Sequence, residues 1–235
     1  MTIKWGFLGA SWVASTALVP AVADAKNASL YAVASRDPER SQKLNPTKVH
    51  ASYEDLISDP DIDAVYISLA NHLHLEWATK ALNAGKHVLC EKPFSVNALE
   101  ARHMVEASIE NNVALLEAMW MRFLPHIHQV RKILASGVLG EIISVTADHG
   151  QRLADQGIVR LVEPSLAGGA LLDLGIYPVS FTYMVLGKPK TISAVSKKAF
   201  TGVDGNTSAL FTYDNDAIAM INTTVLALTA NTAVI

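Results

Sequence analysis

The chain has 235 residues, of which 50% are hydrophobic and 17% charged, and its formal net charge is −3. This composition is typical of a folded globular protein, and the slight negative charge provides no basic surface for nucleic acid. The sequence shows no run of 18 apolar residues and no secretory leader, so we expect neither a membrane span nor export. The single cysteine, Cys90, excludes an internal disulfide framework, and we expect it to be a buried apolar side chain. We therefore expect a soluble, cytoplasmic protein.

Strand-like and helix-like segments alternate through the first half of the chain. The predicted strands are residues 3–8, 30–35, 64–68, 87–91 and 113–116. The predicted helices are residues 13–25 with a kink at Pro20, 38–44 with Asp37 as its cap, 53–58, 72–84 and 96–111. Strands separated by helices of this length indicate parallel βαβ units. The sequence therefore predicts an α/β fold whose residues 1–120 form a doubly wound Rossmann sheet that binds a dinucleotide.

The pattern changes after residue 120. Here the predicted helices are residues 124–136 and 169–186, and the predicted strands are residues 141–148, 191–197, 207–213 and 217–226. Residues 214–216 (Asp-Asn-Asp) predict a hairpin turn. We expect residues 121–235 to form an α+β substrate and dimerisation domain with a mainly antiparallel open sheet. The chain stops inside a strand-like segment, so we expect this domain to be incomplete at its C-terminus.

A lysine follows the fifth predicted strand, in the sequence Glu-Lys-Pro at residues 91–93. Pro93 removes a backbone donor and restricts Lys92 to extended conformations. A cation is thereby held in one orientation at the carboxyl edge of the sheet, where open α/β sheets bind their ligands. An ordinary surface turn is the alternative reading of these three residues alone.

The first strand and first helix are joined by a glycine turn. The three positions of the dinucleotide fingerprint carry Gly9, Ser11 and Ala14, with serine where glycine is usual. The hydroxyl of Ser11 can itself donate to a phosphate oxygen, and the helix N-terminus supplies further donors. After the second strand, Ser35 and Arg36 stand where NAD-selective proteins carry an acidic residue. A hydroxyl and a guanidinium suit the 2′-phosphate of NADP, so we expect NADP, with NAD as the alternative.

Together these segments resemble the glucose-fructose oxidoreductase / inositol dehydrogenase (Gfo/Idh/MocA) family. The resemblance rests on the glycine turn, the Asn-His-Leu-His of residues 71–74, the Glu-Lys-Pro of residues 91–93, and residues 168–178, which read GGALLDLGIYP. Residues 117–125, EAMWMRFLP, are similar to the branch of dimeric dihydrodiol dehydrogenases and NADP-dependent D-xylose dehydrogenases. The resemblance covers essentially the whole chain.

The resemblance implies a role for individual residues. It implies that Lys92 is catalytic and that Asp173 and Tyr177 face it across a cleft. It also implies cofactor contacts at the pyrophosphate, the adenosine phosphate, the ribose and the nicotinamide, made by Gly9, Ser11, Trp12, Val13, Ser35, Arg36, Leu69, Asn71, His74, Glu91, Trp120 and Arg122. Arg152 is a weaker candidate for contact with the substrate. A homodimer formed through the open sheet of the C-terminal domain is expected by the same analogy.

Three features depart from the family pattern. Ala70 stands where the family commonly has proline, the link between Lys43 and Val49 is short, and family members are about a hundred residues longer. The alternatives to an active enzyme are therefore a cofactor-sensing regulatory protein and a catalytically inactive family member.

The chemistry expected is hydride transfer between a nicotinamide and a secondary alcohol or carbonyl of a sugar or vicinal diol. Lys92 and Tyr177 are the expected proton-handling pair, with Asp173 orienting them. Asp173 and Tyr177 are four residues apart on a predicted helix and so lie on one face. The histidine pairs His72/His74 and His126/His128 are each two apart and make poor chelates, so we predict no metal site.

Overall fold

The computed structural model describes residues 1–235 and contains two compact units, Met1–Ala118 and Met119–Ile235. The first unit is built on a six-stranded sheet in the order β3-β2-β1-β4-β5-β6, and every neighbouring pair is parallel. Its strands are β1 (Ile3–Leu8), β2 (Ala28–Ala34), β3 (Lys48–His50), β4 (Ala64–Ile67), β5 (His87–Cys90) and β6 (Leu115–Glu117). The order reverses direction at β1 and β4, which is the switch point of a doubly wound sheet.

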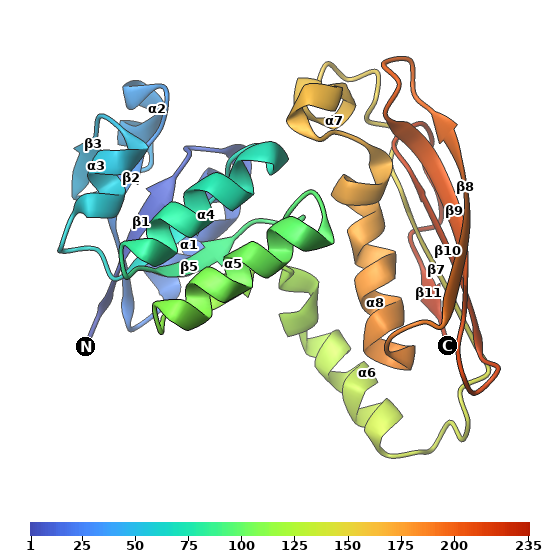
Figure 1. The fold of residues 1–235 in the computed structure, drawn as a ribbon. Coiled ribbons are helices and arrows are strands. Elements are labelled where there is room, and N and C mark those ends of the chain that lie inside the picture. Colours follow the sequence, from blue (N-terminus) through green and yellow to red (C-terminus); the bar gives the residue numbers. More distant parts are fainter. The chain divides into compact units, whose positions relative to one another are not determined.

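Helices cover both faces of this sheet (Figure 1). They are η1 (Ala14–Leu18), α1 (Val19–Asp24), α2 (Pro38–Lys43), α3 (Tyr53–Ser58), η2 (Asn71–Leu73), α4 (His74–Asn83) and α5 (Ala98–Glu110). Alternate residues of β1 point to opposite faces, so Phe7 belongs to the core beneath η1 and α1 while Leu8 belongs to the core beneath α3, α4 and α5. The predicted Rossmann architecture is confirmed.

In the first unit, three elements differ clearly from the sequence predictions. The first predicted helix contains an unpredicted π-helical segment, η1, and Pro20 lies in the turn that directly follows it, at the start of α1. The three-residue strand β3 was not predicted. The strand predicted at residues 113–116 is the shorter β6, shifted towards Glu117.

The second unit contains a five-stranded mixed sheet in the order β11-β7-β10-β9-β8. Its strands are β7 (Ser144–Gly150), β8 (Thr191–Lys198), β9 (Asp204–Thr212), β10 (Ile218–Thr224) and β11 (Ala233–Val234). β7 and β10 are parallel and the other pairs are antiparallel, which confirms a mainly antiparallel sheet. The helices are η3 (Trp120–Phe123), α6 (Pro125–Ala135), α7 (Val159–Val162), η4 (Pro164–Leu166), η5 (Leu171–Gly175) and α8 (Ile176–Leu186).

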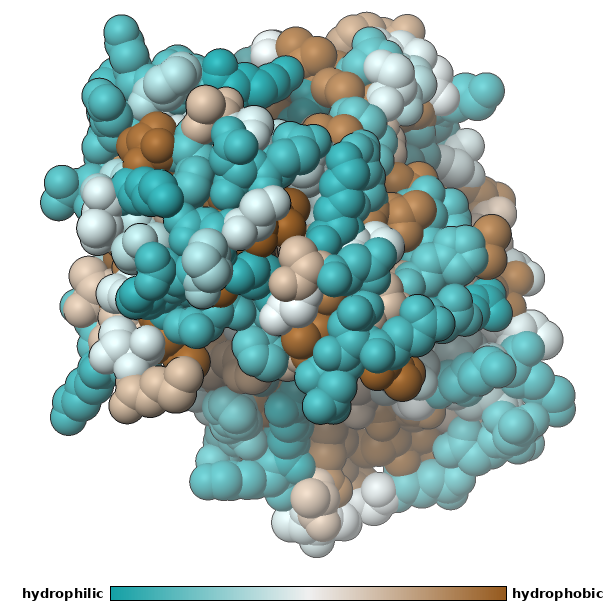
Figure 2. Space-filling view, turned by 60° about the vertical axis from the view of Figure 1, so that its left-hand side comes forward, coloured by the Kyte–Doolittle hydropathy of each residue, from teal (hydrophilic) through white to brown (hydrophobic).

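α8 lies along one face of this sheet, and no helix covers the other face (Figure 1). Val179, Phe181 and Val185 of α8 pack against the buried side chains of the sheet. The stretch Pro164–Leu186 is long and apolar enough to cross a membrane by length and composition, although the sequence showed no continuous run of 18 apolar residues. Its packing against the sheet is that of a core helix. The face of the molecule in Figure 2 is mainly hydrophilic, with apolar residues scattered between polar ones.

Candidate active site

The glycine turn lies at the carboxyl end of β1. Gly9 has a φ of +95°, and a Cβ at this position would lie 2.9 Å from the main-chain oxygen of Ser68, so only glycine fits. The Oγ of Ser11 accepts a hydrogen bond from the Ala14 main-chain N–H at 3.1 Å, which leaves the Ser11 hydroxyl proton available to a ligand. Trp12 follows with a side chain that is 78% exposed. The turn therefore ends in a helix start with donors at the sheet edge, as a pyrophosphate site requires.

The end of β2 carries a second group of polar side chains. Ser35 donates its hydroxyl proton to the main-chain oxygen of Asp37 at 2.6 Å, and Arg36 is exposed. Asp37 caps α2 as predicted, because its Oδ1 accepts from the N–H groups of Glu39 and Arg40. The guanidinium of Arg40 donates to the main-chain oxygen of Ala10 at 2.6 Å. Arg40 thus joins α2 to the glycine turn and places a cation beside it.

Lys92 stands directly after β5, at the same edge of the sheet. The peptide bond between Lys92 and Pro93 is cis. Glu91 supports this segment, since its Oε2 accepts from the Lys92 main-chain N–H at 3.2 Å and its Oε1 accepts from the Tyr66 hydroxyl at 2.6 Å. Burial, followed by the charge of Glu91, raises the pKa of Tyr66, so the phenol stays protonated and remains the donor.

Glu117 holds the same segment from the neighbouring strand. Its Oε1 accepts a hydrogen bond from the main-chain N–H of Phe94 at 3.0 Å. Glu117 is the last residue of β6, and the parallel pairing of β6 with β5 brings it to the Lys92 edge. Glu117 was not predicted from the sequence as a site residue, although its position directly after a predicted strand was a usable signal. Two carboxylates, Glu91 and Glu117, therefore fix the backbone on either side of residues 92 and 93.

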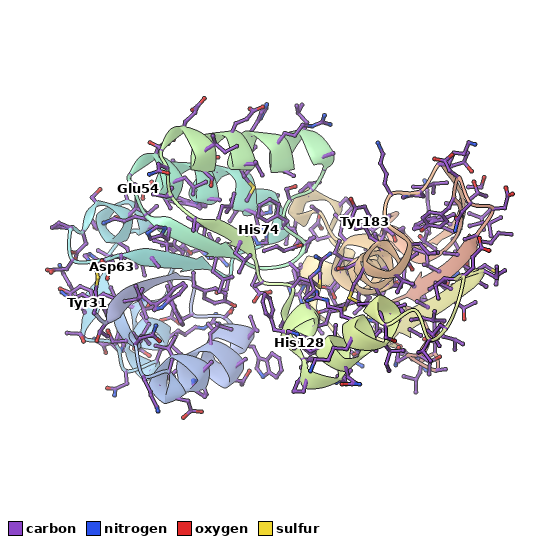
Figure 3. All side chains as sticks on the ribbon, turned by 90° about the horizontal axis from the view of Figure 1, so that it is seen from below. Tyr31, Glu54, Asp63, His74, His128 and Tyr183 are labelled. Atoms are coloured by element: carbon purple, nitrogen blue, oxygen red, sulfur yellow. The ribbon has the colours of Figure 1, made fainter.

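His74 is fully buried at the start of α4 and points into the interior of the first unit (Figure 3). Its Nδ1 lies 2.8 Å from the main-chain oxygen of Pro93, and its Nε2 lies 3.2 Å from that of Leu69. Burial lowers the pKa of His74, and the two carbonyls oppose that effect. The ring therefore binds the Pro93 backbone to the loop after β4. His74 stays a predicted cofactor contact, and its ring also supports the loop that carries two other predicted contacts, Leu69 and the buried Asn71.

Tyr177 begins α8 and is surrounded by two other rings of the second unit. The indole Nε1 of Trp120 donates to the Tyr177 hydroxyl oxygen at 2.8 Å, with the ring centroids 5.9 Å apart. His149, near the end of β7, packs edge-on against Tyr177 with a centroid distance of 5.1 Å. An indole can only donate, so the oxygen of Tyr177 is the acceptor and its proton is directed elsewhere. His149 was not identified from the sequence, because the strand predicted there ended before it.

Asp173 lies one helical turn before Tyr177, in the π-helical segment η5, and its side chain is 7% exposed. The Nη1 of Arg160 donates to its Oδ1 at 2.9 Å. The start of this helix is capped by Asp204, whose Oδ2 accepts from the Leu171 N–H at 2.7 Å. Gly169 has a φ of +131°, and a Cβ there would overlap Oδ1 of Asp204, so the glycine is what allows the cap to approach.

Arg122 and Arg152 lie at different places in the second unit. Arg122 donates from Nε to the Oγ of Ser180 at 3.1 Å, which ties η3 to α8. Arg152 is exposed and forms two hydrogen bonds to Oδ2 of Asp155, so its guanidinium is already engaged locally. His126 and His128 are exposed, as expected of surface residues, and His128 is marked in Figure 3. No group of three or more His, Cys, Asp or Glu side chains is arranged to hold a metal ion.

Both halves of the chain match models of one protein family. Residues 3–119 match the oxidoreductase family with an NAD-binding Rossmann fold, and residues 127–235 match the GFO/IDH/MocA C-terminal domain. The trans-1,2-dihydrobenzene-1,2-diol dehydrogenase of Homo sapiens is 37% identical over 241 residues, covering 99% of this chain and 71% of the relative. The enzyme of the same name from Mus musculus is also 37% identical, with 72% of the relative covered.

Solved structures agree with this match. A 3-ketoreductase from Actinomadura kijaniata in complex with NADP and TDP-benzene superposes with a TM-score of 0.92 at 29% identity, covering 99% of this chain and 73% of that one. An aldose-aldose oxidoreductase from Caulobacter crescentus, complexed with glycerol, gives 0.90 at 25% identity, covering 97% and 72%. The sequence, the fold and these likenesses lead to one conclusion: the chain belongs to the Gfo/Idh/MocA family of oxidoreductases.

Proposed function

We propose that this oxidoreductase uses NADP to transfer a hydride between the nicotinamide and a secondary alcohol or carbonyl of a sugar or vicinal diol. The observation that carries the proposal is the setting of Lys92. A lysine stands at the carboxyl edge of a parallel sheet, beside the switch point and a glycine turn, on a backbone fixed by Glu91 and Glu117. A structural lysine needs no such fixation, whereas a group that meets a reacting oxygen does.

The residues around the glycine turn suit a dinucleotide with a 2′-phosphate. Gly9 allows close approach of the chain, and Ser11 and the η1 N-terminus offer donors to the pyrophosphate. Arg36 follows β2 and is exposed, the guanidinium of Arg40 donates to the Ala10 oxygen in the glycine turn, and the Ser35 hydroxyl lies at the end of β2. Guanidinium groups bind phosphate through paired hydrogen bonds, so this arrangement favours NADP over NAD. The remaining proposed cofactor contacts are Trp12, Val13, Leu69, Asn71, His74, Glu91, Trp120 and Arg122.

The bound nicotinamide would accept or supply the hydride, and the side chains would manage the proton and the developing charge. We assign to Lys92 the stabilisation of negative charge on the reacting oxygen. Tyr177 has its oxygen occupied by the Trp120 donor, so its hydroxyl proton can be passed to or from the substrate oxygen. Asp173, ion-paired with Arg160, acts as a hydrogen-bond acceptor for a substrate hydroxyl. Arg152 is proposed as a further substrate contact.

The relatives support this substrate class. Their names describe a dihydrodiol dehydrogenase, a 3-ketoreductase and an aldose-aldose oxidoreductase, all of which handle a carbon bearing a hydroxyl or carbonyl group. The solved structures of the ketoreductase include a lysine-to-alanine and a tyrosine-to-phenylalanine variant, both in complex with NADP. These are the residue types to which we assign charge stabilisation and proton transfer in this chain.

We also propose a cytoplasmic homodimer formed through the uncovered sheet face of the second unit. Apolar side chains on this sheet are exposed, among them Val195, Leu210 and Met220. They line a hollow of about 660 Å³ together with Ser193, Ser208 and Asn222. An exposed apolar area of this kind on a sheet favours association with a second copy.

Turnover with a defined panel of substrates tests the function. The protein would be mixed with NADP or NAD and with aldoses and vicinal diols, and the absorbance of the reduced cofactor followed. We expect turnover with at least one diol or aldose and a higher kcat/KM with NADP. Tight cofactor binding without turnover on any substrate would favour a cofactor-sensing or inactive member of the family and overturn the proposal.

Two variants test the assigned roles. Lys92→Met and Tyr177→Phe should each lower kcat by about 10²-fold or more, because the first removes a group that stabilises developing charge and the second a positioned proton donor or acceptor. Both should bind NADP with the affinity of the unmodified protein, measured by quenching of tryptophan fluorescence. Normal kcat in the Lys92→Met protein would remove Lys92 from the mechanism.

A further inference from the structure

The short helix α7 is fastened to the chain just before η5. The N–H of Gly169 donates to the main-chain oxygen of Leu161 at 2.9 Å, and the N–H of Gly168 donates to that of Glu163 at 3.2 Å. A Cβ on Gly168 would lie 2.8 Å from the main-chain carbon and oxygen of Leu161. The glycine therefore lets the backbone of α7 come into direct contact with the backbone that leads into η5.

The side chains of α7 add to this attachment. Leu161 is 1% exposed, and Val162 packs against the cluster formed by Ala170, Leu174 and Val225. Arg160 precedes Leu161, so the anchoring of its neighbour fixes the point from which the arginine side chain extends. Holding an arginine side chain in one conformation costs rotamer entropy. Because the backbone at Arg160 is already fixed, its hydrogen bond must offset only the entropy of the side chain.

Arg160 uses this position to reach Asp173. Its Nη1 donates to Oδ1 of Asp173 at 2.9 Å, between a side chain 52% exposed and one 7% exposed. A carboxylate so deeply buried is unfavourable without a cationic partner, and removing one partner of such a pair leaves the other charge uncompensated. The contact is a charge-assisted hydrogen bond, which fixes direction as well as charge.

We propose that Arg160 is a positioning residue of the active site, acting through Asp173 to fix the direction and the charge of its carboxylate towards the substrate. The inference rests on the proposed function, because it takes Asp173 as the acceptor for a substrate hydroxyl. In this arrangement one carboxylate oxygen is occupied by Arg160, and the carboxylate acts as an acceptor without serving as a proton donor. The glycine pair of residues 168 and 169 is the structural means by which α7 delivers the arginine.

The kinetic test compares Arg160→Met and Arg160→Lys with Arg131→Met. Arg131 is a suitable control because it is another arginine of the second unit, bonded from Nε to the sulfur of Met184 on α8. With a diol or aldose that the protein oxidises, we expect Arg160→Met to lower kcat/KM about tenfold to a hundredfold, the range for one hydrogen bond to a charged group. Arg160→Lys should restore part of this loss, and Arg131→Met should leave kcat/KM unchanged.

A double variant shows whether Arg160 acts through Asp173. If it does, adding Arg160→Met to Asp173→Asn should change kcat/KM by less than about twofold, because the path is already interrupted. If the fold-losses in kcat/KM of the two single variants multiply in the double variant, Arg160 acts independently of Asp173, and the proposal is overturned. Methylguanidinium at millimolar concentration should raise the kcat of Arg160→Ala but not that of Asp173→Asn, a response that a purely structural arginine would not show.

A measurement without turnover separates this inference from the proposed function. The Nη1–H signal of the Arg160 guanidinium in ¹H–¹⁵N spectra should be shifted and slow to exchange in the unmodified protein, and it should lose both properties in Asp173→Asn. If no substrate is turned over while this signal is present, the proposed function and the positioning role are both overturned. The ion pair of Arg160 with Asp173 would still be established. Turnover with no change of the Arg160 signal in Asp173→Asn would overturn the inference alone.

Discussion

The indole N–H of Trp120 donates a hydrogen bond to the hydroxyl oxygen of Tyr177 at 2.8 Å. Since indole nitrogen has no lone pair to offer, the direction of this bond is fixed by chemistry. The donor stabilises negative charge on the tyrosine oxygen, and the tyrosine proton is directed at an acceptor other than the indole. From the sequence, Trp120 is expected to contact the cofactor. In the structure its N–H also makes the hydroxyl oxygen of Tyr177 a hydrogen-bond acceptor.

Replacing Trp120 by phenylalanine removes this donor while keeping an aromatic ring. We expect kcat to fall about tenfold to a hundredfold, as for the loss of a hydrogen bond to an oxygen that carries charge during the reaction. KM for the cofactor should change less than kcat. Trp5→Phe, the same exchange in the first unit, should leave kcat unchanged, and an unchanged kcat in Trp120→Phe would show that the bond has no part in proton transfer.

Cofactor selectivity should depend on Arg40 as well as on Arg36. Arg40→Met removes the cation that donates to the Ala10 oxygen beside the glycine turn. We expect the ratio of kcat/KM for NADP to that for NAD to fall about tenfold or more, the scale of a charge-assisted contact to phosphate. Arg102→Met on the exposed face of α5 is the matched control. If the NADP-to-NAD ratio of kcat/KM is unchanged in Arg40→Met, residues other than Arg40 recognise the 2′-phosphate.

Acid stability should depend on Asp59, near the amino end of β4. The hydrogen bond from Lys48 lowers the pKa of Asp59 to about 2, with further bonds from the Asp61 N–H and His50 overcoming the effect of burial. Because the folded-state pKa lies below the unfolded value, the stabilisation is complete above about pH 4 and is lost as the pH falls towards 2.

The variant Asp59→Asn should therefore lose about 1–2 kcal/mol of unfolding free energy at pH 7, after allowance for screening by solvent, and should lose less additional free energy between pH 4 and 2 than the unmodified protein does. Urea unfolding at several pH values measures this. Asp214→Asn, which removes an exposed carboxylate paired with Lys190, should follow the unmodified protein. An Asp59→Asn protein that loses stability with acid as steeply as the unmodified one would contradict the assignment.

Substitution of Gly169 should be far more costly than substitution of an ordinary loop glycine. In Gly169→Ala the new Cβ meets the carboxylate of Asp204 at a φ of +131°, so strain adds to a displaced helix cap, and we expect a loss of about 3 kcal/mol. Gly157 also has a positive φ, +72°, but has nothing within 4 Å of the added atom, so Gly157→Ala should cost about 1 kcal/mol. Equal midpoints of thermal unfolding in the two variants would contradict this account.

The parts of the fold with strong local signals could be predicted from the sequence. The glycine turn and the strand before Lys92 each combine a run of apolar residues with a residue whose local geometry is restrictive, and the cap at Asp37 is followed by a proline that suits the first helical turn. Strand β3 and helix α7 could not be predicted, because three and four residues are too few to show a period. Their existence depends on pairing with β2 and on the backbone contact at Gly168.

The candidate site shows the same division. Helical spacing correctly placed Asp173 and Tyr177 one turn apart, since that depends on the chain alone. The environment of each side chain depends on tertiary contacts: Arg160 reaches Asp173 from another helix, Glu117 reaches the Phe94 N–H from another strand, and the ring of His74 turns inward. In Figure 3, Tyr31 and Asp63 are labelled on the side of the first sheet away from His74. No functional residue was expected there.

The parallel pairing of β7 with β10 has a consequence for folding. Thr146 pairs with Met220, so α7, η5, α8 and the β8–β9 hairpin must be accommodated before the middle of this sheet can close. Contacts between residues so far apart in sequence are slow to form, because the entropy of closing the loop is lost before the pairing is gained. We expect the β7–β10 pairing to be the last part of this sheet to form. Hydrogen-exchange protection should therefore appear in β8 and β9 before it appears in β7.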